Sequence, residues 1–135
     1  MEQSEVVRIQ CGVEMLLDRV CPRGGWNAGN GVVYGTSLTP HPDDTAIALL
    51  ALKGHANEPA FIRSLEWLEA TAPNLQAPWS CAWALLALAA YSRNVDRLLN
   101  SLATLIEPAG IQDVATLALA ALALDYQRSL SLLKS

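Results

Sequence analysis

A five-residue pattern of alanine and leucine recurs three times along the chain and limits the folds that it can adopt. Residues 48–52 are Ala-Leu-Leu-Ala-Leu, and the same five residues begin again at Ala84. Ala-Leu-Ala-Ala-Leu follows at Ala118, so the successive offsets are 36 and 34 residues. A repeat of about this length is typical of stacked helical hairpins, because each hairpin buries its apolar side against its neighbours.

Helical periodicity extends through most of the remaining sequence. Apolar residues recur at three- and four-residue steps, which predicts amphipathic helices. The expected helices cover Val6–Val20, Thr45–Leu52, Phe61–Ala70, Ser80–Tyr91, Asp96–Ile106 and Val114–Tyr126. Pro59 and Pro78 fall between them, where proline is tolerated. A brief strand signal at Val32–Tyr34 interrupts the polar segment 21–42.

The six expected helices alternate between mixed and almost purely apolar composition. A helix without charged residues needs cover on both sides, so the Ala/Leu helices are expected to form an inner layer. The mixed helices then form an outer layer with one side in solvent. The sequence therefore predicts one all-α domain, residues 1–135, made of three helical hairpins at about 5–53, 59–92 and 95–127.

Composition excludes several classes of protein. Of the 135 residues, 52% are hydrophobic and only 16% are charged, whereas disordered chains combine low hydropathy with high charge. Nine Lys and Arg against thirteen Asp and Glu leave no cationic face for nucleic acid. A small domain with so few charges is expected to bring some apolar surface against a partner.

The cysteines and the apolar stretches bear on metal binding, membrane insertion and cellular location. Cys11, Cys21 and Cys81 form no CxxC motif and no Cys/His pair at metal-ligand spacing, so neither a metal nor another cofactor is expected. The acidic N-terminus does not resemble a secretory signal. The longest uncharged stretches, Trp79–Tyr91 and Val114–Leu124, are shorter than a bilayer span. We therefore expect no transmembrane segment and a cytoplasmic location.

Two stretches carry a family resemblance. They are Cys-Pro-Arg-Gly-Gly-Trp-Asn-Ala-Gly-Asn-Gly at 21–31 and Pro-Asp-Asp-Thr-Ala-Ile-Ala-Leu-Leu-Ala-Leu at 42–52. Together with the helix before them, they resemble the prenyltransferase and squalene-cyclase repeat. In that family a Gly–x–Trp motif, matched here by Gly24 to Trp26, ties one hairpin to the next. The family's usual glutamine six residues before the tryptophan is replaced by Val20, which weakens this bracing.

The resemblance implies an architecture and a class of ligand. The family fold is an α/α toroid, a ring of inner helices wrapped by outer helices, and three hairpins correspond to about half of a closed ring. A second copy of the chain would supply the missing half in a homodimer; the alternative is that the domain belongs to a longer chain. The implied ligand is an isoprenoid-like apolar small molecule.

The resemblance also assigns candidate catalytic residues. Asp43-Asp44-Thr45-Ala46 resembles the end of the D-x-D-D-T-A motif of class II terpenoid cyclases, in which the middle aspartate donates a proton to an alkene or epoxide. Asp43 matches the proton donor, and Asp44 and His41 would support it. His41 replaces the motif's first aspartate, which removes part of the support that an acid needs to keep its proton at neutral pH. The alternative role for the two aspartates is to cap the following helix.

Aromatic residues supply the candidate ligand-binding set. Trp79 and Trp83 are four residues apart and share one helix face, and Tyr91 lies two turns further on. If they face the ring centre, they would line an apolar site together with Trp26 or stabilise a cation through their π faces. The alternative is ordinary packing in the core or at a dimer contact.

Three hypotheses for function follow. The first is a toroid-type repeat domain without complete catalytic machinery, which binds an apolar ligand or a partner. The second is an isoprenoid cyclase, active as a dimer, with Asp43 as proton donor and Trp83 steadying positive charge. The third is a purely structural helical scaffold.

Overall fold

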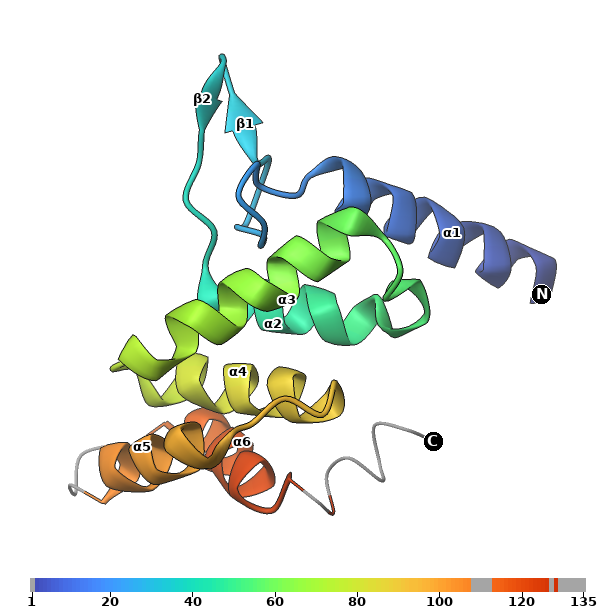
Figure 1. Cartoon of the computed structure of the whole chain (residues 1–135). Coiled ribbons are helices and arrows are strands. Elements are labelled where there is room, and N and C mark those ends of the chain that lie inside the picture. The colour runs from blue at the N-terminus through green and yellow to red at the C-terminus, as the bar shows by residue number, and fades with distance from the viewer. Residues whose placement is uncertain (1, 108–112, 127, 129–135) are drawn as a thin grey trace.

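The computed structural model describes residues 2–107, 113–126 and 128, and most of these residues are helical. Figure 1 labels the elements along the chain. The helices are α1 (Glu2–Asp18), α2 (Pro42–Ala51), α3 (Pro59–Thr71), α4 (Pro78–Ala90), α5 (Asp96–Ile106) and α6 (Val114–Leu124). Two 3-10 turns, η1 (Lys53–His55) and η2 (Ala72–Asn74), follow α2 and α3, and the two short strands are β1 (Val32–Val33) and β2 (Thr36–Ser37).

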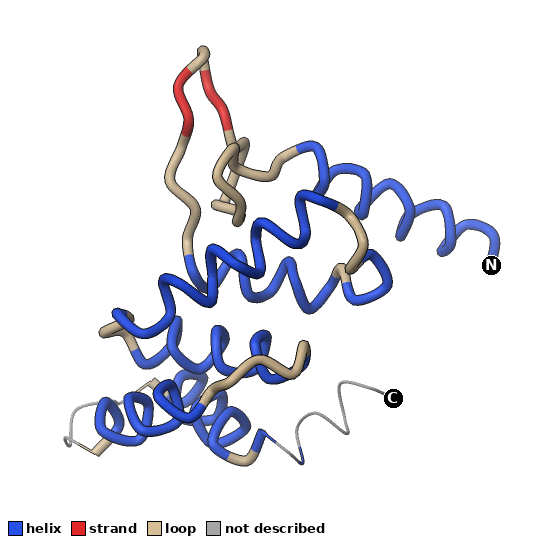
Figure 2. The backbone as a smooth tube through the Cα atoms, in the orientation of Figure 1, coloured by secondary structure: helices blue, strands red, loops and turns tan. Residues whose placement is uncertain are grey.

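The helices after α1 form two layers. The Ala/Leu helices α2, α4 and α6 stack in that order, with α4 in contact with both of the others. The mixed helices form the second layer: α3 packs on α2 and α4, and α5 packs on α4 and α6 (Figure 2). The structure thus confirms the six expected helices. The third predicted hairpin, 95–127, includes residues 108–112 and 127, which lie outside the described residues.

Prolines begin three of the helices instead of separating them. Pro42, Pro59 and Pro78 are the first residues of α2, α3 and α4. The prediction that Pro59 and Pro78 lie between helices was therefore wrong, because α3 and α4 each begin two residues earlier than expected. The first helical position needs no backbone N–H, and the fixed φ of proline already suits a helix, so proline is favoured there.

Burial differs sharply between α4 and α6 although both are Ala/Leu helices. Eight consecutive or near-consecutive residues of α4 are buried, including Cys81 and Leu85 with no exposed surface. In α6, Leu119, Ala120 and Ala123 are buried, whereas Val114 is 78% exposed. The Ala/Leu helices were expected to be covered on both sides. This expectation is confirmed for α4, whereas α6 is covered on one side only.

Two elements project from the two layers in Figure 1. Residues 3–11 of α1 are all exposed, and α1 packs against the rest through its C-terminal part, where Val13 is buried. The hairpin of β1 and β2 pairs Val33 with Thr36, and Tyr34 at its tip is fully exposed. Tyr34 and Gly35 both have positive φ (49° and 77°), as a two-residue type I′ turn requires.

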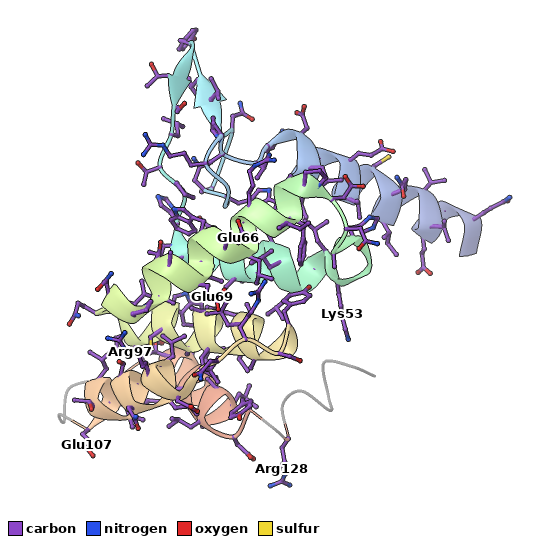
Figure 3. The ribbon with its side chains drawn as sticks, viewed as in Figure 1. Lys53, Glu66, Glu69, Arg97, Glu107 and Arg128 are labelled. Atoms are coloured by element: carbon purple, nitrogen blue, oxygen red, sulfur yellow. The ribbon has the colours of Figure 1, made fainter. Side chains whose placement is uncertain are left out.

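Charged side chains mark the outer layer. Figure 3 labels Glu66 and Glu69 on α3 and Arg97 and Glu107 on and after α5. Glu69 forms a half-exposed ion pair with Arg93, at 3.2 Å between Oε2 and Nη1. By contrast, α4 and α6 contain no charged residue. In the Ala/Leu layer the charged residues are Asp43 and Asp44, in the first turn of α2.

Candidate functional site

The turn at Gly24, Gly25 and Trp26 is fixed by two buried hydroxyl groups. Thr45 Oγ1 accepts a hydrogen bond from the Trp26 backbone N–H at 2.9 Å and donates one to the Trp26 carbonyl at 3.2 Å. Ser64 Oγ accepts from the Gly25 N–H at 2.8 Å. These bonds join the loop to α2 and α3, so they place Trp26 directly at the start of α2.

Glycine is required at this turn for space as well as for conformation. Gly24 and Gly25 have φ values of +96° and +80°, which favour glycine. A Cβ on Gly24 would lie 2.6 Å from the Arg63 carbonyl oxygen, and one on Gly25 would lie 2.7 Å from the Pro40 Cβ. The glycines therefore serve close packing of the loop on α3 and on the segment before α2.

Trp26 is a structural residue and also a wall of a groove. It is 3% exposed, and its indole Nε1 donates to the Leu16 carbonyl oxygen at 2.7 Å, which ties the end of α1 to the loop. Beside it lies an open groove of about 260 Å³ between the C-terminal part of α1, the loop and α2. Its lining residues are Met15, Leu16, Arg19, Trp26, Asn27, Ala28, Gly29, Asp44, Ile47, Ala48 and Ala51.

The groove combines apolar walls with two opposite charges. Met15 and Leu16 from α1 face Ile47 and Ala48 from α2, while Arg19 and Asp44 contribute the charged groups. Such a mixture suits a small molecule that is mostly apolar and carries a polar end, since apolar walls provide affinity and a few polar groups provide orientation.

Asp43 and Asp44 lie in the first turn of α2, and the N-cap residue of that helix is His41. His41 Nδ1 and Asp44 Oδ2 are 3.0 Å apart, with side chains 57% and 36% exposed, so the structure brings these two candidates together at the surface. Neither aspartate is the N-cap itself. Both occupy the helix end where the macrodipole favours negative charge.

By contrast, α6 has an aspartate cap. Asp113 accepts hydrogen bonds from the Ala115 and Thr116 backbone N–H groups and from the Thr116 hydroxyl. These bonds, the Thr116 hydroxyl first among them, lower the pKa of Asp113 below its ordinary value. An aspartate side chain thus caps α6, whereas the N-cap residue of α2 makes no side-chain capping bond.

The remaining aromatic candidates lie on and after α4, away from the groove. Trp79 and Trp83 meet edge to face, with ring centroids 5.9 Å apart. Tyr91 donates from its hydroxyl to the Leu49 carbonyl oxygen and packs against Phe61 at 5.0 Å between centroids. Burial raises the pKa of the Tyr91 hydroxyl. The structure therefore brings Trp79 and Trp83 together, but it places Trp26 and Asp44 at a different site.

Trp83 carries an unusual polar group. Its indole Nε1 is buried and has no hydrogen-bond partner among the described residues. A buried donor without an acceptor costs free energy.

Several groove residues were not predicted from the sequence. Met15, Arg19, Ile47 and Ala51 line it, yet they looked like ordinary positions of two amphipathic or apolar helices. Ile47 carried the one usable signal, because it is the β-branched residue in an otherwise Ala/Leu run. Ser64 was also missed, since nothing in a mixed helix marks one serine as buried.

Two further observations concern metal ligands and membrane-spanning helices. Within the described part of the chain, no three His, Cys, Asp or Glu side chains are grouped as metal ligands are. Across the same residues, no helix has both the length and the apolar character that crossing a bilayer requires.

Comparison with protein-family models, curated proteins and solved structures gives no match for this chain.

Proposed function

We propose that the chain is a toroid-type helical repeat domain, about half of a ring, that binds an isoprenoid-like apolar ligand without complete catalytic machinery of its own. The architecture is supported by the order of the layers, because each Ala/Leu helix contacts the next one at a spacing of about one hairpin. In a ring of this kind the missing half comes from a second copy or from further chain.

The observation that carries ligand binding is the groove beside Trp26. Its walls are apolar, it is open to solvent, and its one cation, Arg19, is suited to the anionic or polar end of a prenyl compound. The resemblance of segments 21–31 and 42–52 to the prenyltransferase and squalene-cyclase repeat supports the same class of ligand.

Binding is favoured over acid-initiated cyclisation by the position of the aspartates. A carboxylic acid that stays protonated at neutral pH needs an apolar, enclosed site or a neighbouring carboxylate. Asp44 is 36% exposed and is paired with His41, and Asp43 is only half-buried at the same helix end. Neither aspartate therefore has the enclosed, apolar surroundings that a proton donor of this kind needs.

The test is retention of a prenyl diphosphate or of squalene in native mass spectrometry, followed by extraction and identification of the ligand. We expect one compound to be retained and recovered unchanged. Met15→Glu places a charge on the apolar wall of the groove and should weaken retention at least about tenfold, because an unpaired carboxylate is poorly tolerated beside an apolar chain. Met15 is 47% exposed, so the substitution spares the core.

Ile62→Glu is the matched control, since Ile62 on α3 is 44% exposed and lines no part of the groove. Retention that is equal in both variants, or absent in the unmodified chain, contradicts the proposal. Recovery of a cyclised product would replace binding by catalysis, with Asp43 as the residue to examine.

A further inference from the structure

A second pocket, separate from the groove beside Trp26, is formed where the loop 21–31, the segment 37–40 and α3 meet. Its volume is about 350 Å³, it is more enclosed than the groove, and the two share no lining residue. Trp67 from α3, with Pro22, Leu38 and Pro40, provides the apolar part of its lining. Small-molecule sites are typically pockets of about 300–1,000 Å³ whose apolar walls carry a few polar groups.

The polar part of this lining consists of one cation and two hydroxyl groups. Of the described residues, Arg23 is the one charged group that lines the pocket, and Ser37 and Thr39 add the hydroxyls. These three side chains form no hydrogen bond or ion pair with any other residue that the structure describes. A guanidinium and hydroxyl groups are donors that suit a carboxylate or a phosphate, so the pocket has the polar groups for an anion.

The cation lies on a tight turn that backbone hydrogen bonds fix. The Gly24 N–H donates to the Cys21 carbonyl oxygen at 2.8 Å, and the Cys21 N–H donates to the Gly25 carbonyl oxygen at 2.9 Å. Arg23 is therefore a central residue of a β-turn. Because Cys21 is 1% exposed, the turn is anchored in the protein interior while Arg23 itself is exposed.

The segment that carries the hydroxyl groups is also held at two points. The Leu38 N–H donates to the Gly31 carbonyl oxygen at 2.9 Å, and the His41 N–H donates to the Trp26 carbonyl oxygen at 2.7 Å. Thr39 lies between these two bonds. A site whose donors are already in place loses less conformational entropy when a ligand binds.

Trp67 gives the pocket a flat apolar surface. This side chain is half-buried, and a Cβ on Gly25 would lie 3.1 Å from its Cε3 atom and 2.7 Å from the Pro40 Cβ. The indole and the proline ring are therefore both packed against the turn. An indole surface of this kind favours a ring that stacks on it or meets it edge to face.

We propose that this pocket binds a small anionic molecule with a flat, apolar ring system. The ring lies against Trp67, and the carboxylate or phosphate group binds Arg23 with help from Ser37 and Thr39. The chain has a net charge of −4, so this local cation and short hydrogen bonds must hold the anion, and added salt should weaken binding. The proposal does not depend on the proposed function, because it uses no residue of the groove.

Titration of the full chain with naphthoate, followed in amide and indole N–H NMR spectra, tests the proposal. We expect saturable shifts at the Trp67 indole N–H and at the Arg23 and Thr39 amides, with a dissociation constant of about 1 mM or tighter for a ligand of this size. Naphthamide has the same shape without the charge and should bind at least about tenfold more weakly. Naphthyl phosphate is the second anionic probe, and the tighter of the two anions identifies the group that the site takes.

Arg23→Gln removes the charge at an exposed position and should raise the dissociation constant for naphthoate at least about tenfold. Arg97→Gln is the matched control, since Arg97 on α5 is also exposed and lines no part of this pocket. It changes the net charge of the chain by the same amount and should leave naphthoate binding unchanged.

Three results overturn the proposal: equal dissociation constants in the two variants, equal binding of naphthamide and naphthoate, or no saturable shift in the unmodified chain. A fourth is weakening by Arg19→Gln and not by Arg23→Gln, because the probe would then occupy the groove. Retention of a prenyl compound is measured separately at the groove, so the proposed function can stand or fail without this pocket.

Discussion

Two buried hydroxyl groups hold the loop at 21–31 in place, in addition to the glycines that allow its conformation. Thr45 and Ser64 are both fully buried, and each forms hydrogen bonds to backbone groups on another segment. A side chain that satisfies buried backbone groups in this way fixes a loop, because leaving those groups unpaired is expensive. The position of Trp26, and with it one wall of the groove, depends on these two residues.

Differences in burial predict that the three cysteine thiols react at different rates. Burial raises the pKa of the Cys81 thiol to about 11 and also raises that of Cys21, so both remain protonated near neutral pH. Cys11 on α1 is exposed. Because the thiolate is the reactive form, we expect an aromatic disulfide reagent to label one thiol per native chain quickly and all three after denaturation.

Cys11→Ser provides the control for this measurement. The variant should lose the fast-reacting thiol and keep the two that appear on denaturation. Fast labelling of more than one thiol in the native chain would show that the buried positions of Cys21 and Cys81 are wrong.

At the scale of elements, the loop before α2 and the β1–β2 hairpin offer a matched pair of glycines. Gly24 and Gly35 both have positive φ, but only Gly24 lies against other backbone, whereas a Cβ on Gly35 meets no atom within 4 Å. Gly35→Ala should lower the free energy of unfolding by about 1 kcal/mol, the usual cost of a left-handed residue. Gly24→Ala adds overlap with Arg63 and should cost about 3 kcal/mol or more.

Denaturant unfolding of the two variants, at one protein concentration, measures the difference. Equal losses would mean that the loop does not pack closely on α3. A smaller loss for Gly24→Ala than for Gly35→Ala would contradict both the clash and the role of this turn in holding Trp26.

The Ala/Leu helices show how one composition can occupy different environments. Leu85 in α4 and Leu119 in α6 are both buried, but Leu88 and Leu122 differ completely in exposure. The helical period places all four residues correctly on their helices. The helical period does not specify how many neighbouring helices pack on each helix, and burial depends on that number.

At the scale of the whole molecule, a second copy that completes the proposed half ring would make stability depend on concentration. Association that requires the folded chain stabilises it by mass action, so the thermal midpoint should rise as the protein concentration rises. Calorimetry over a dilution series measures this dependence; a midpoint that does not change with concentration contradicts the dimer.

Sequence alone determined the elements of this protein. Periodic apolar residues and the recurring Ala/Leu pattern placed six helices along the chain, and α5 was predicted with the bounds that it has, Asp96–Ile106. These predictions succeeded because helical phase and average polarity are local properties. The nearness of His41 to Asp44 also followed from their positions on either side of a helix start.

Only the tertiary structure decided which faces of those helices are covered. It exposed one side of α6, brought Trp26 onto the Leu16 carbonyl, and formed the groove from Met15 and Arg19 at the end of α1 and Ile47 on α2, which lie far apart in sequence. Alanine and leucine carry no directional groups, so their pattern cannot specify which neighbour packs on which side. That choice is made by the packing of whole helices, where the largest apolar area is removed from water.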